Sequence, residues 1–162
     1  MTEAAPSPLA QALGRVPTGL FVASTNAEGG APLGFVASFA TQVGLAPPTV
    51  CLAVGKGRAP LAAIRASGRF ALSILDNESS KLMSAFFRKY DGDETPFDHV
   101  PHAPAGGDGP PVLDAALAWL DCKVTGEHEL EDHVVVFGEV TAGEQRRAGD
   151  PSVHLRKNGL GY

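Results

Sequence analysis

The stretch AALAWLDCKVTGEHELEDHVVVFGEVTA, residues 115–142, decides the fold class of this sequence. It holds two long runs rich in apolar, β-branched and aromatic residues, Ala115–Thr125 and His133–Ala142, on either side of the acidic segment Gly126–Asp132. Two such runs around a polar turn are typical of a β-hairpin. We therefore expect an antiparallel hairpin in this part of the chain.

Shorter strand-like runs occupy much of the remaining sequence, and turn-forming residues bound most of them. They are Gly19–Thr25, Leu33–Thr41, Thr49–Val54, Phe70–Leu75 and, near the end, Ser152–Arg156. Helical patterns are few, because glycine (19 residues) and proline (13 residues) interrupt the chain often. They are confined to Leu9–Arg15, Ala59–Ala66 and Glu78–Tyr90.

This order of elements favours a mainly β protein. A doubly wound parallel sheet needs a helix after nearly every strand, and those helices are missing. The pattern instead predicts a closed antiparallel barrel with short helical inserts. We expect residues 1–9 to be a flexible N-terminal segment and residues 10–162 to form one domain. Asp91–Pro111, rich in glycine, proline and aspartate, is expected to be a long loop without regular structure.

Composition narrows the class of function. The 162 residues are 44% hydrophobic, which is enough for a core, and they carry a formal net charge of −5. That charge argues against nucleic-acid binding, which usually needs a basic surplus. No apolar run approaches the ~18 residues of a membrane span, and the acidic start lacks the pattern of a signal peptide. We expect a cytoplasmic protein that binds neither nucleic acid nor membrane.

Few residues suggest catalysis by themselves. The five histidines lack the spacing and cysteine partners of a zinc site, so no metal site is expected. The chain has no G-x-S-x-G elbow, Rossmann glycine motif or Walker loop. Lys56 and Arg58, on either side of Gly57 in a turn before a predicted helix, are able to converge on an anion such as a phosphate. The alternative is that both are ordinary surface cations.

Several segments in the same order resemble the flavin reductase-like, FMN-binding split-barrel family. They are GRVPTG (14–19), GFVASF (34–39), L-x-PP (45–48), RASGRFALSIL (65–75), LDAALAWLDCKV (113–124) and DHVVVFGEV (132–140). The closing VHLRKNGLGY (153–162) resembles a branch also found as the reductase module of flavodiiron fusions. The resemblance implies a six-stranded antiparallel Greek-key split barrel that forms a homodimer, with FMN near the subunit interface.

The resemblance also implies roles for particular residues. The segment Val36, Ala37, Ser38 and Phe39 matches the strand that holds the isoalloxazine, with Ser38 hydrogen-bonding the flavin. Lys56, Gly57 and Arg58 match the phosphate-side turn, and His133 matches the histidine of a Gly-Asp-His motif near the nicotinamide. Arg156 matches a terminal arginine that reaches the flavin or the partner subunit. The alternative to these binding roles is a purely structural one, in which Ala37 and Phe39 belong to the barrel core and His133 is a turn histidine bonded to Asp132.

This chain also departs from the family pattern. Many members have Thr at the position of Val36, Ser at that of Phe39 and Gly at that of Glu131. The expected function is that of an NAD(P)H-dependent FMN reductase, with FAD as a possible replacement for FMN. Hydride would pass from NADH or NADPH to flavin N5. The reduced flavin or its electrons would then go to a flavin-dependent monooxygenase or another acceptor. The alternative is a non-enzymatic, flavoredoxin-like FMN protein that carries electrons.

Overall fold

The computed structural model describes residues 5–161. The first four residues of the expected flexible segment, and Tyr162, lie outside that range. The helical elements are α1 (Pro8–Leu13), η1 (Glu28–Gly30), α2 (Ala59–Ser67), η2 (Ser79–Phe87), η3 (Pro96–Asp98) and η4 (Ala105–Gly107). The strands are β1 (Thr18–Gly19), β2 (Phe21–Asn26), β3 (Pro32–Ala37), β4 (Ala40–Leu45), β5 (Pro48–Gly55), β6 (Arg69–Ile74), β7 (His102–Pro104), β8 (Pro111–Leu113), β9 (Ala118–Glu129), β10 (His133–Gln145) and β11 (Val153–His154).

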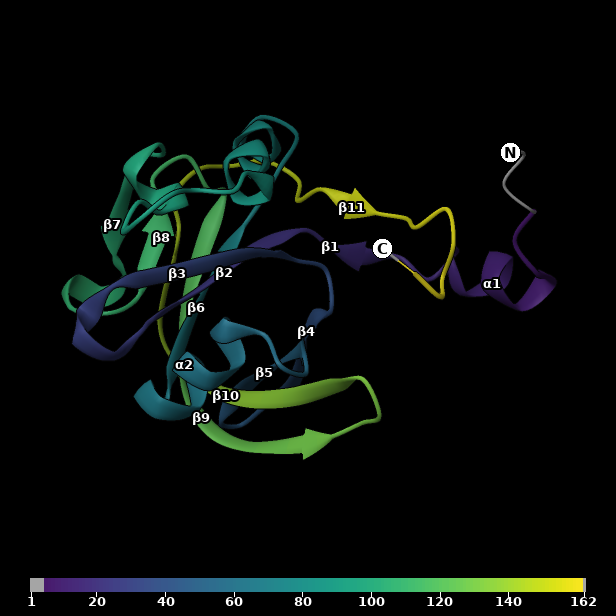
Figure 1. The fold of residues 1–162 in the computed structure, drawn as a ribbon, viewed down its shortest axis with the longest axis horizontal. Coiled ribbons are helices and arrows are strands. Elements are labelled where there is room, and N and C mark those ends of the chain that lie inside the picture. The colour runs from purple at the N-terminus through teal and green to yellow at the C-terminus, as the bar shows by residue number, and fades with distance from the viewer. Residues whose placement is uncertain (1–4, 162) are drawn as a thin grey trace.

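The predicted mainly β architecture is confirmed. One antiparallel sheet in the order β3-β2-β6-β9-β10-β5-β4 curls around the main core (Figure 1). The expected hairpin is β9 and β10, in which Val134 pairs with Glu129 and the turn contains only residues 130–132. On its other side β10 pairs with β5, which places His133 opposite Gly55.

The sheet has seven strands rather than six, because Leu33–Thr41 is not one strand. It divides into β3 and β4, and Ser38 and Phe39 form the corner between them. Ala37 and Ala40 are buried on either side of this corner. β3 and β4 are the two edges of the sheet and are not paired with each other, so the barrel is split at this corner.

Two sequence expectations need correction. Glu78–Tyr90, expected as an amphipathic helix, contains the 3₁₀ helix η2, whose three residues per turn place Met83 and Phe86 together against a second core cluster. Asp91–Pro111 is not structureless, since η3, β7 and η4 lie within it and β7 pairs with β8. Phe97 and Val100 anchor this segment in the same cluster, although no regular spacing marks them in the sequence.

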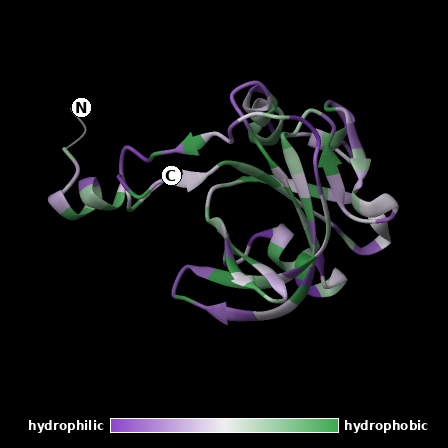
Figure 2. Cartoon of the chain, turned by 180° about the vertical axis from the view of Figure 1, so that it is seen from behind, coloured by the Kyte–Doolittle hydropathy of each residue, from purple (hydrophilic) through white to green (hydrophobic). Residues whose placement is uncertain are grey.

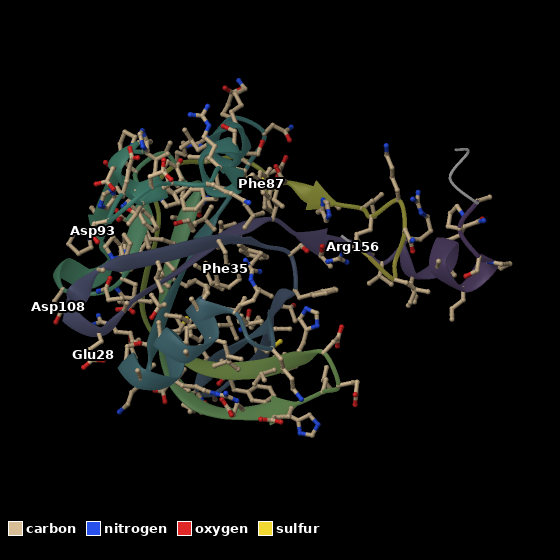
Figure 3. The ribbon with its side chains drawn as sticks, viewed as in Figure 1. Glu28, Phe35, Phe87, Asp93, Asp108 and Arg156 are labelled. Carbon is tan, nitrogen blue, oxygen red and sulfur yellow. The ribbon has the colours of Figure 1, made fainter. Side chains whose placement is uncertain are left out.

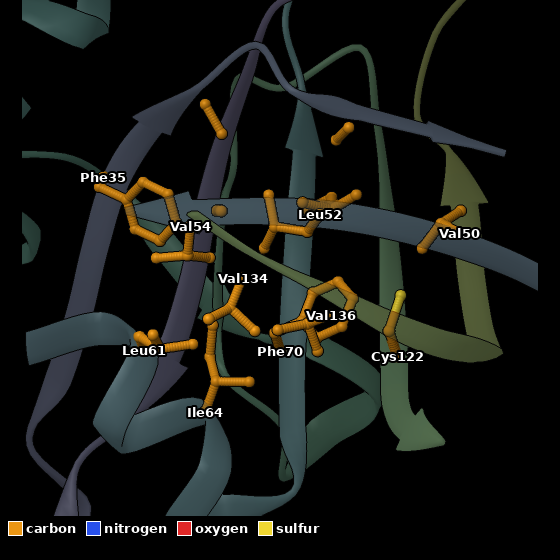
Figure 4. Packing of buried hydrophobic residues seen from close by; sticks show 14 residues of the cluster. Phe35, Val50, Leu52, Val54, Leu61, Ile64, Phe70, Cys122, Val134 and Val136 are labelled. Atoms are coloured by element: carbon orange, nitrogen blue, oxygen red, sulfur yellow. The ribbon is translucent and has the colours of Figure 1, made fainter. Parts of the chain in front are cut away.

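The main core fills the inside of the barrel (Figure 4). Alternate residues of β5 and β10 point inward, among them Leu52, Val54 and Val136, and each is almost fully buried. The helix α2 begins at Ala59, as predicted, and ends at Ser67, one residue beyond the predicted end. Its Leu61 and Ile64 pack against these strands. No helix within residues 5–161 is both long and apolar enough to cross a membrane.

An arm extends away from the barrel (Figure 1). It consists of residues 5–19 and 152–161, in which β1 pairs with β11 through Thr18 with His154 and Gly19 with Val153. Figure 2 shows apolar stretches on the arm as well as on the barrel strands. The exposed apolar side chains of the arm are Leu9, Leu13, Val16, Val153, Leu155 and Leu160.

A buried ion pair links two central strands. Asp121 of β9 has a side chain only 2% exposed, and its Oδ2 lies 2.6 Å from Nη2 of Arg69 on β6. The hydrogen bond from Arg69 to Asp121 raises the pKa of the guanidinium. Asp108, whose side chain is 83% exposed, contacts the same guanidinium at 3.0 Å. One arginine therefore has a buried and a solvated carboxylate partner.

We expect Asp121→Asn to lower the free energy of unfolding by about 2–3 kcal/mol, because it removes one charge of a buried pair. Asp108→Asn is the matched control and should leave the urea midpoint nearly unchanged, since its partner contact is exposed to solvent. Urea unfolding followed by circular dichroism measures both. Equal losses in the two variants would contradict the expectation.

Candidate functional site

A cavity of about 600 Å³ lies where the arm meets the barrel. Four segments form its walls: the arm, the corner between β3 and β4, β5, and the hairpin end of β10. Its residues include Pro17, Thr18, Ser38, Phe39, Cys51, Ala53, Leu130, His133 and Val135. This volume is within the range of small-molecule and cofactor sites.

The floor of the cavity is the outer face of the sheet. Side chains alternate along a strand, so Val50, Leu52 and Val54 enter the core while Cys51 and Ala53 face the cavity. Val135 of β10 lies opposite Ala53 and extends the same apolar surface. Small side chains at this floor leave room for a flat ligand to approach the backbone.

The corner between β3 and β4 supplies a hydroxyl and an aromatic ring. The carbonyl of Phe39 accepts a hydrogen bond from the backbone N–H of Ala53 at 2.9 Å, which ties the corner to β5. With Ala37 and Ala40 buried, Phe39 faces outward and is 38% exposed. Phe39 is therefore part of the cavity wall rather than of the barrel core.

Arg156 reaches this corner from the arm (Figure 3). Its Nη2 donates a hydrogen bond to Oγ of Ser38 at 2.5 Å. Its guanidinium carbon lies 4.0 Å from the centre of the Phe39 ring, in a cation–π contact. The structure thus brings together three residues that the sequence resemblance assigned to a flavin site.

His133 closes another side of the cavity. It is the first residue of β10, and its side chain is 15% exposed. The ring stands edge-on to Phe39 with 5.8 Å between centroids, and Nδ1 lies 3.0 Å from Oδ2 of Asp132. The hydrogen bond from His133 lowers the pKa of the Asp132 carboxyl, so Asp132 stays ionised at neutral pH. Asp132 thereby holds the imidazole beside Phe39.

The predicted phosphate turn lies beyond His133 and does not line the cavity. Lys56 follows Gly55, the pairing partner of His133, and its backbone N–H donates to the carbonyl of Asp132 at 2.9 Å. Gly57 has a φ of +76°, which favours glycine at the centre of this turn. Figure 2 colours most, but not all, of the adjacent hairpin end hydrophilic.

Both cations of this turn have partners within the chain. Nζ of Lys56 is 3.4 Å from Oε2 of Glu129. Arg58 places its guanidinium 5.1 Å from the centre of the Phe35 ring. Each pairing leaves the side chain exposed and so free to turn toward an anion.

Val36 and Ala37 are placed differently from Ser38 and Phe39. Ala37 packs in the main core, and neither residue lines the cavity, so neither side chain supplies a wall of this site. Sequence reasoning missed Cys51, Ala53 and Val135 as floor residues. On β5, the alternation of Cys51 and Ala53 with the buried Val50, Leu52 and Val54 could have shown that they face away from the core. Val135 lies in the same way between the buried Val134 and Val136 of β10.

The site combines an apolar, partly aromatic wall with the hydroxyl side chains of Thr18, Ser38 and Thr41 and with nearby cations. Such a surface suits a flat ring system that carries an anionic group. Among residues 5–161 there is no group of three or more histidine, cysteine, aspartate or glutamate side chains placed to hold a metal ion. Burial raises the pKa of the Cys122 thiol to about 12, and this cysteine does not line the cavity.

Known proteins share this chain's sequence and fold. The NADH-dependent flavin reductase StyB of Pseudomonas fluorescens is 35% identical over 143 residues, which cover 87% of this chain and 79% of StyB. The NADH:FAD oxidoreductase SgcE6 of Streptomyces globisporus superposes with a TM-score of 0.81 at 28% identity, covering 91% of this chain and 86% of SgcE6.

Some relatives are much longer. Diflavin flavoprotein A 1 of Synechocystis is 34% identical over 158 residues, yet the match covers 96% of this chain and only 27% of that protein. A Rhizobium meliloti relative is matched over 46% of its length. The family described as "Flavin reductase like domain" matches residues 13–159, nearly the whole of the fold and every wall of the cavity. The chain therefore belongs to the flavin reductase-like domain family.

Proposed function

We propose that this chain is an NAD(P)H-dependent flavin reductase that uses FMN and delivers reduced flavin or electrons to a partner. One observation carries the proposal: in a member of this family, Ser38, Phe39, His133 and Arg156 converge on one apolar cavity. FAD is a second flavin that the same ring site would accept, as the names of relatives such as SgcE6 suggest.

The cavity fits a flavin ring in three respects. Its volume is about 600 Å³, its floor is apolar, and Ser38 offers a hydroxyl at the corner between β3 and β4. Backbone groups of residues 36–39 are the proposed hydrogen-bonding edge, since the Ala37 side chain is in the core. Bound FMN would supply the hydride acceptor, because flavin N5 takes hydride from C4 of a nicotinamide.

The residues of this chain would then bind and orient the two rings. Phe39 would stack on an aromatic ligand from the cavity wall. His133, held by Asp132, is placed to contact the nicotinamide side and to keep the two rings at reacting distance. No side chain needs to give or take a proton for hydride transfer itself.

Lys56, Gly57 and Arg58 are the proposed phosphate turn. They adjoin the cavity through the pairing of Gly55 with His133 and immediately precede α2. A phosphate there would compete with Glu129 for Lys56, which limits the affinity gained. This competition suits a flavin that is exchanged rather than permanently held.

We further propose a cytoplasmic homodimer whose acceptor is a flavin-dependent monooxygenase or another electron-accepting protein. The exposed apolar surface supports the dimer: Val43 and Leu45 lie on the edge strand β4, and Leu45 is 85% exposed. The arm adds further exposed apolar side chains, including Val153 and Leu155 of the terminal strand region. Such a surface is commonly covered by a protein partner.

The first experiment measures steady-state oxidation of NADH and NADPH by the purified protein with added FMN. A reductase shows saturable turnover far above that of free flavin. His133→Gln should lower this turnover by about tenfold, because the nicotinamide loses an orienting contact, while FMN binding stays intact. Turnover no greater than that of free flavin, with FMN still retained after desalting, would instead indicate the non-enzymatic electron carrier.

A second experiment compares FMN with riboflavin, which lacks the phosphate. We expect wild type to bind FMN at least about tenfold more tightly than riboflavin, through charge-assisted contacts to Lys56 and Arg58. The double variant K56Q/R58Q should lose this preference and keep its riboflavin affinity. Quenching of flavin fluorescence measures all four dissociation constants. A variant that still prefers FMN would show that the phosphate binds elsewhere.

The dimer is tested by light scattering after size-exclusion chromatography. Wild type should have twice the mass of one chain, and V43E/L45E should be a folded monomer because charges disrupt an apolar interface. Phe87→Glu, a matched change at an exposed position on η2, should leave the mass unchanged. A monomeric wild type would contradict the proposal.

A further inference from the structure

We propose that Glu129 is a specificity-determining residue of the proposed phosphate turn, and that it weakens binding of the FMN phosphate more than binding of the FAD phosphates. The inference rests on the proposed function and deepens it, because it concerns which flavin the turn from Lys56 to Arg58 selects. Glu129 lies beside this turn and is not one of the residues that line the cavity.

The carboxylate of Glu129 is close to the turn and is held in place there. Glu129 is the last residue of β9, and its Oε2 lies 3.4 Å from Nζ of Lys56. Its other oxygen, Oε1, accepts a hydrogen bond at 3.3 Å from Nη2 of Arg65 on α2. Because Arg65 and Glu129 belong to two regular elements of the barrel, their contact keeps the carboxylate beside Lys56 even when the lysine turns toward an anion.

Lys56 also lies near a second carboxylate. Its backbone N–H donates to the carbonyl of Asp132 at 2.9 Å. The pKa of the Asp132 carboxyl is lowered mainly by the hydrogen bond from His133, and the charge of Lys56 adds to this effect. Two carboxylates therefore offset the positive charge of Lys56.

Arg58, the other cation of the turn, is placed by packing. Its guanidinium carbon lies 5.1 Å from the centre of the Phe35 ring. A Cβ added at Gly55 would lie 3.3 Å from Cδ of Arg58, so the stem of the arginine passes closely over this glycine. The two cations thus have different surroundings, and Glu129 acts on the charge balance of the turn at Lys56.

The two flavins differ in the charge that they would bring to this turn. FMN ends in a phosphate monoester, which carries a charge of about −1.5 to −2 at pH 7. Each phosphate of FAD is a diester with a single negative charge. Since repulsion grows in proportion to charge, a fixed carboxylate opposes the FMN phosphate with about twice the free energy that it costs one FAD phosphate. Riboflavin has no phosphate and is unaffected. Glu129 therefore narrows the difference in affinity between FMN and FAD.

The test is the dissociation constant of FMN, FAD and riboflavin for wild type, E129Q and E127Q, measured by flavin fluorescence at low salt. E129Q should bind FMN about fivefold and FAD about twofold more tightly than wild type, with riboflavin binding unchanged, because the repulsion scales with charge. E127Q is the matched control: Glu127 is on the same strand and pairs with the same Arg65, at 2.8 Å. It should leave FMN binding within about twofold of wild type.

A larger gain for FMN than for FAD, seen in E129Q and not in E127Q, supports this role of Glu129. The role is overturned if E129Q binds FMN no more tightly, if FMN and FAD gain equally, if riboflavin gains as well, or if E127Q matches E129Q. In each of these cases the proposed function stands as long as wild type reduces FMN. If wild type and E129Q neither bind nor reduce flavin, the inference and the proposed function fail together.

The salt dependence of FMN binding gives an independent readout. Raising NaCl from about 0.05 M to about 0.5 M screens charges at the protein surface, so the FMN dissociation constants of wild type and E129Q should converge to within about twofold. A difference that persists at high salt would show that the substitution acts through the shape of the hairpin end, and it would overturn the proposal.

Discussion

The pairing of β5 with β10 is the constraint on which the rest of the structure depends. Its inward residues, among them Leu52, Val54 and Val136, form much of the barrel core, and its outward residues Cys51, Ala53 and Val135 form the floor of the cavity. The same register sets His133 opposite Gly55, which places the turn of Lys56, Gly57 and Arg58, the proposed phosphate site, at one end of the ladder. A shift of one residue would exchange core and floor at every position. Stability and site geometry therefore depend on the same hydrogen bonds.

Much of this could be predicted from the sequence, because local patterns determine the elements involved. Alternation of apolar side chains indicated β5, and long β-branched runs indicated the β9–β10 hairpin. The corner at Ser38 and Phe39 escaped detection, because the apolar run from Leu33 continues across it and no glycine or proline marks the break. For η2, the spacing of Leu82, Met83 and Phe86 suits both a 3₁₀ and an α-helix, and packing against the second cluster decides between them.

Residue patterns alone did not identify the site. The resemblance to a known family indicated which residues would take part in it. No local pattern connects Ser38 with Arg156, which is 118 residues away. Their contact depends on the pairing of β1 with β11. The sequence indicated a strand at Ser152–Arg156, but it did not indicate the partner strand Thr18–Gly19. Ala37 lies in the main core, as the structural interpretation of the sequence expected. Phe39 instead faces the cavity. His133 contacts Asp132, as its interpretation as a turn histidine expected, and it also lines the cavity. Its contact with the nicotinamide stays a prediction.

The position of the arm also governs how this domain can be joined to other proteins. Both ends of the described chain lie on the arm (Figure 1), on the side where the cavity opens between the arm and the barrel. A linker attached at the C-terminal end would start close to the cavity, because that end lies beside β1, whereas the N-terminal end lies at the far tip of the arm beyond α1. A tethered acceptor would then experience a high effective concentration of reduced flavin, and transfer would become intramolecular instead of depending on diffusion through bulk solvent. In such an arrangement the linker would continue directly from the segment whose Arg156 contacts Ser38 and Phe39, so the tether and the cavity wall would share one piece of chain.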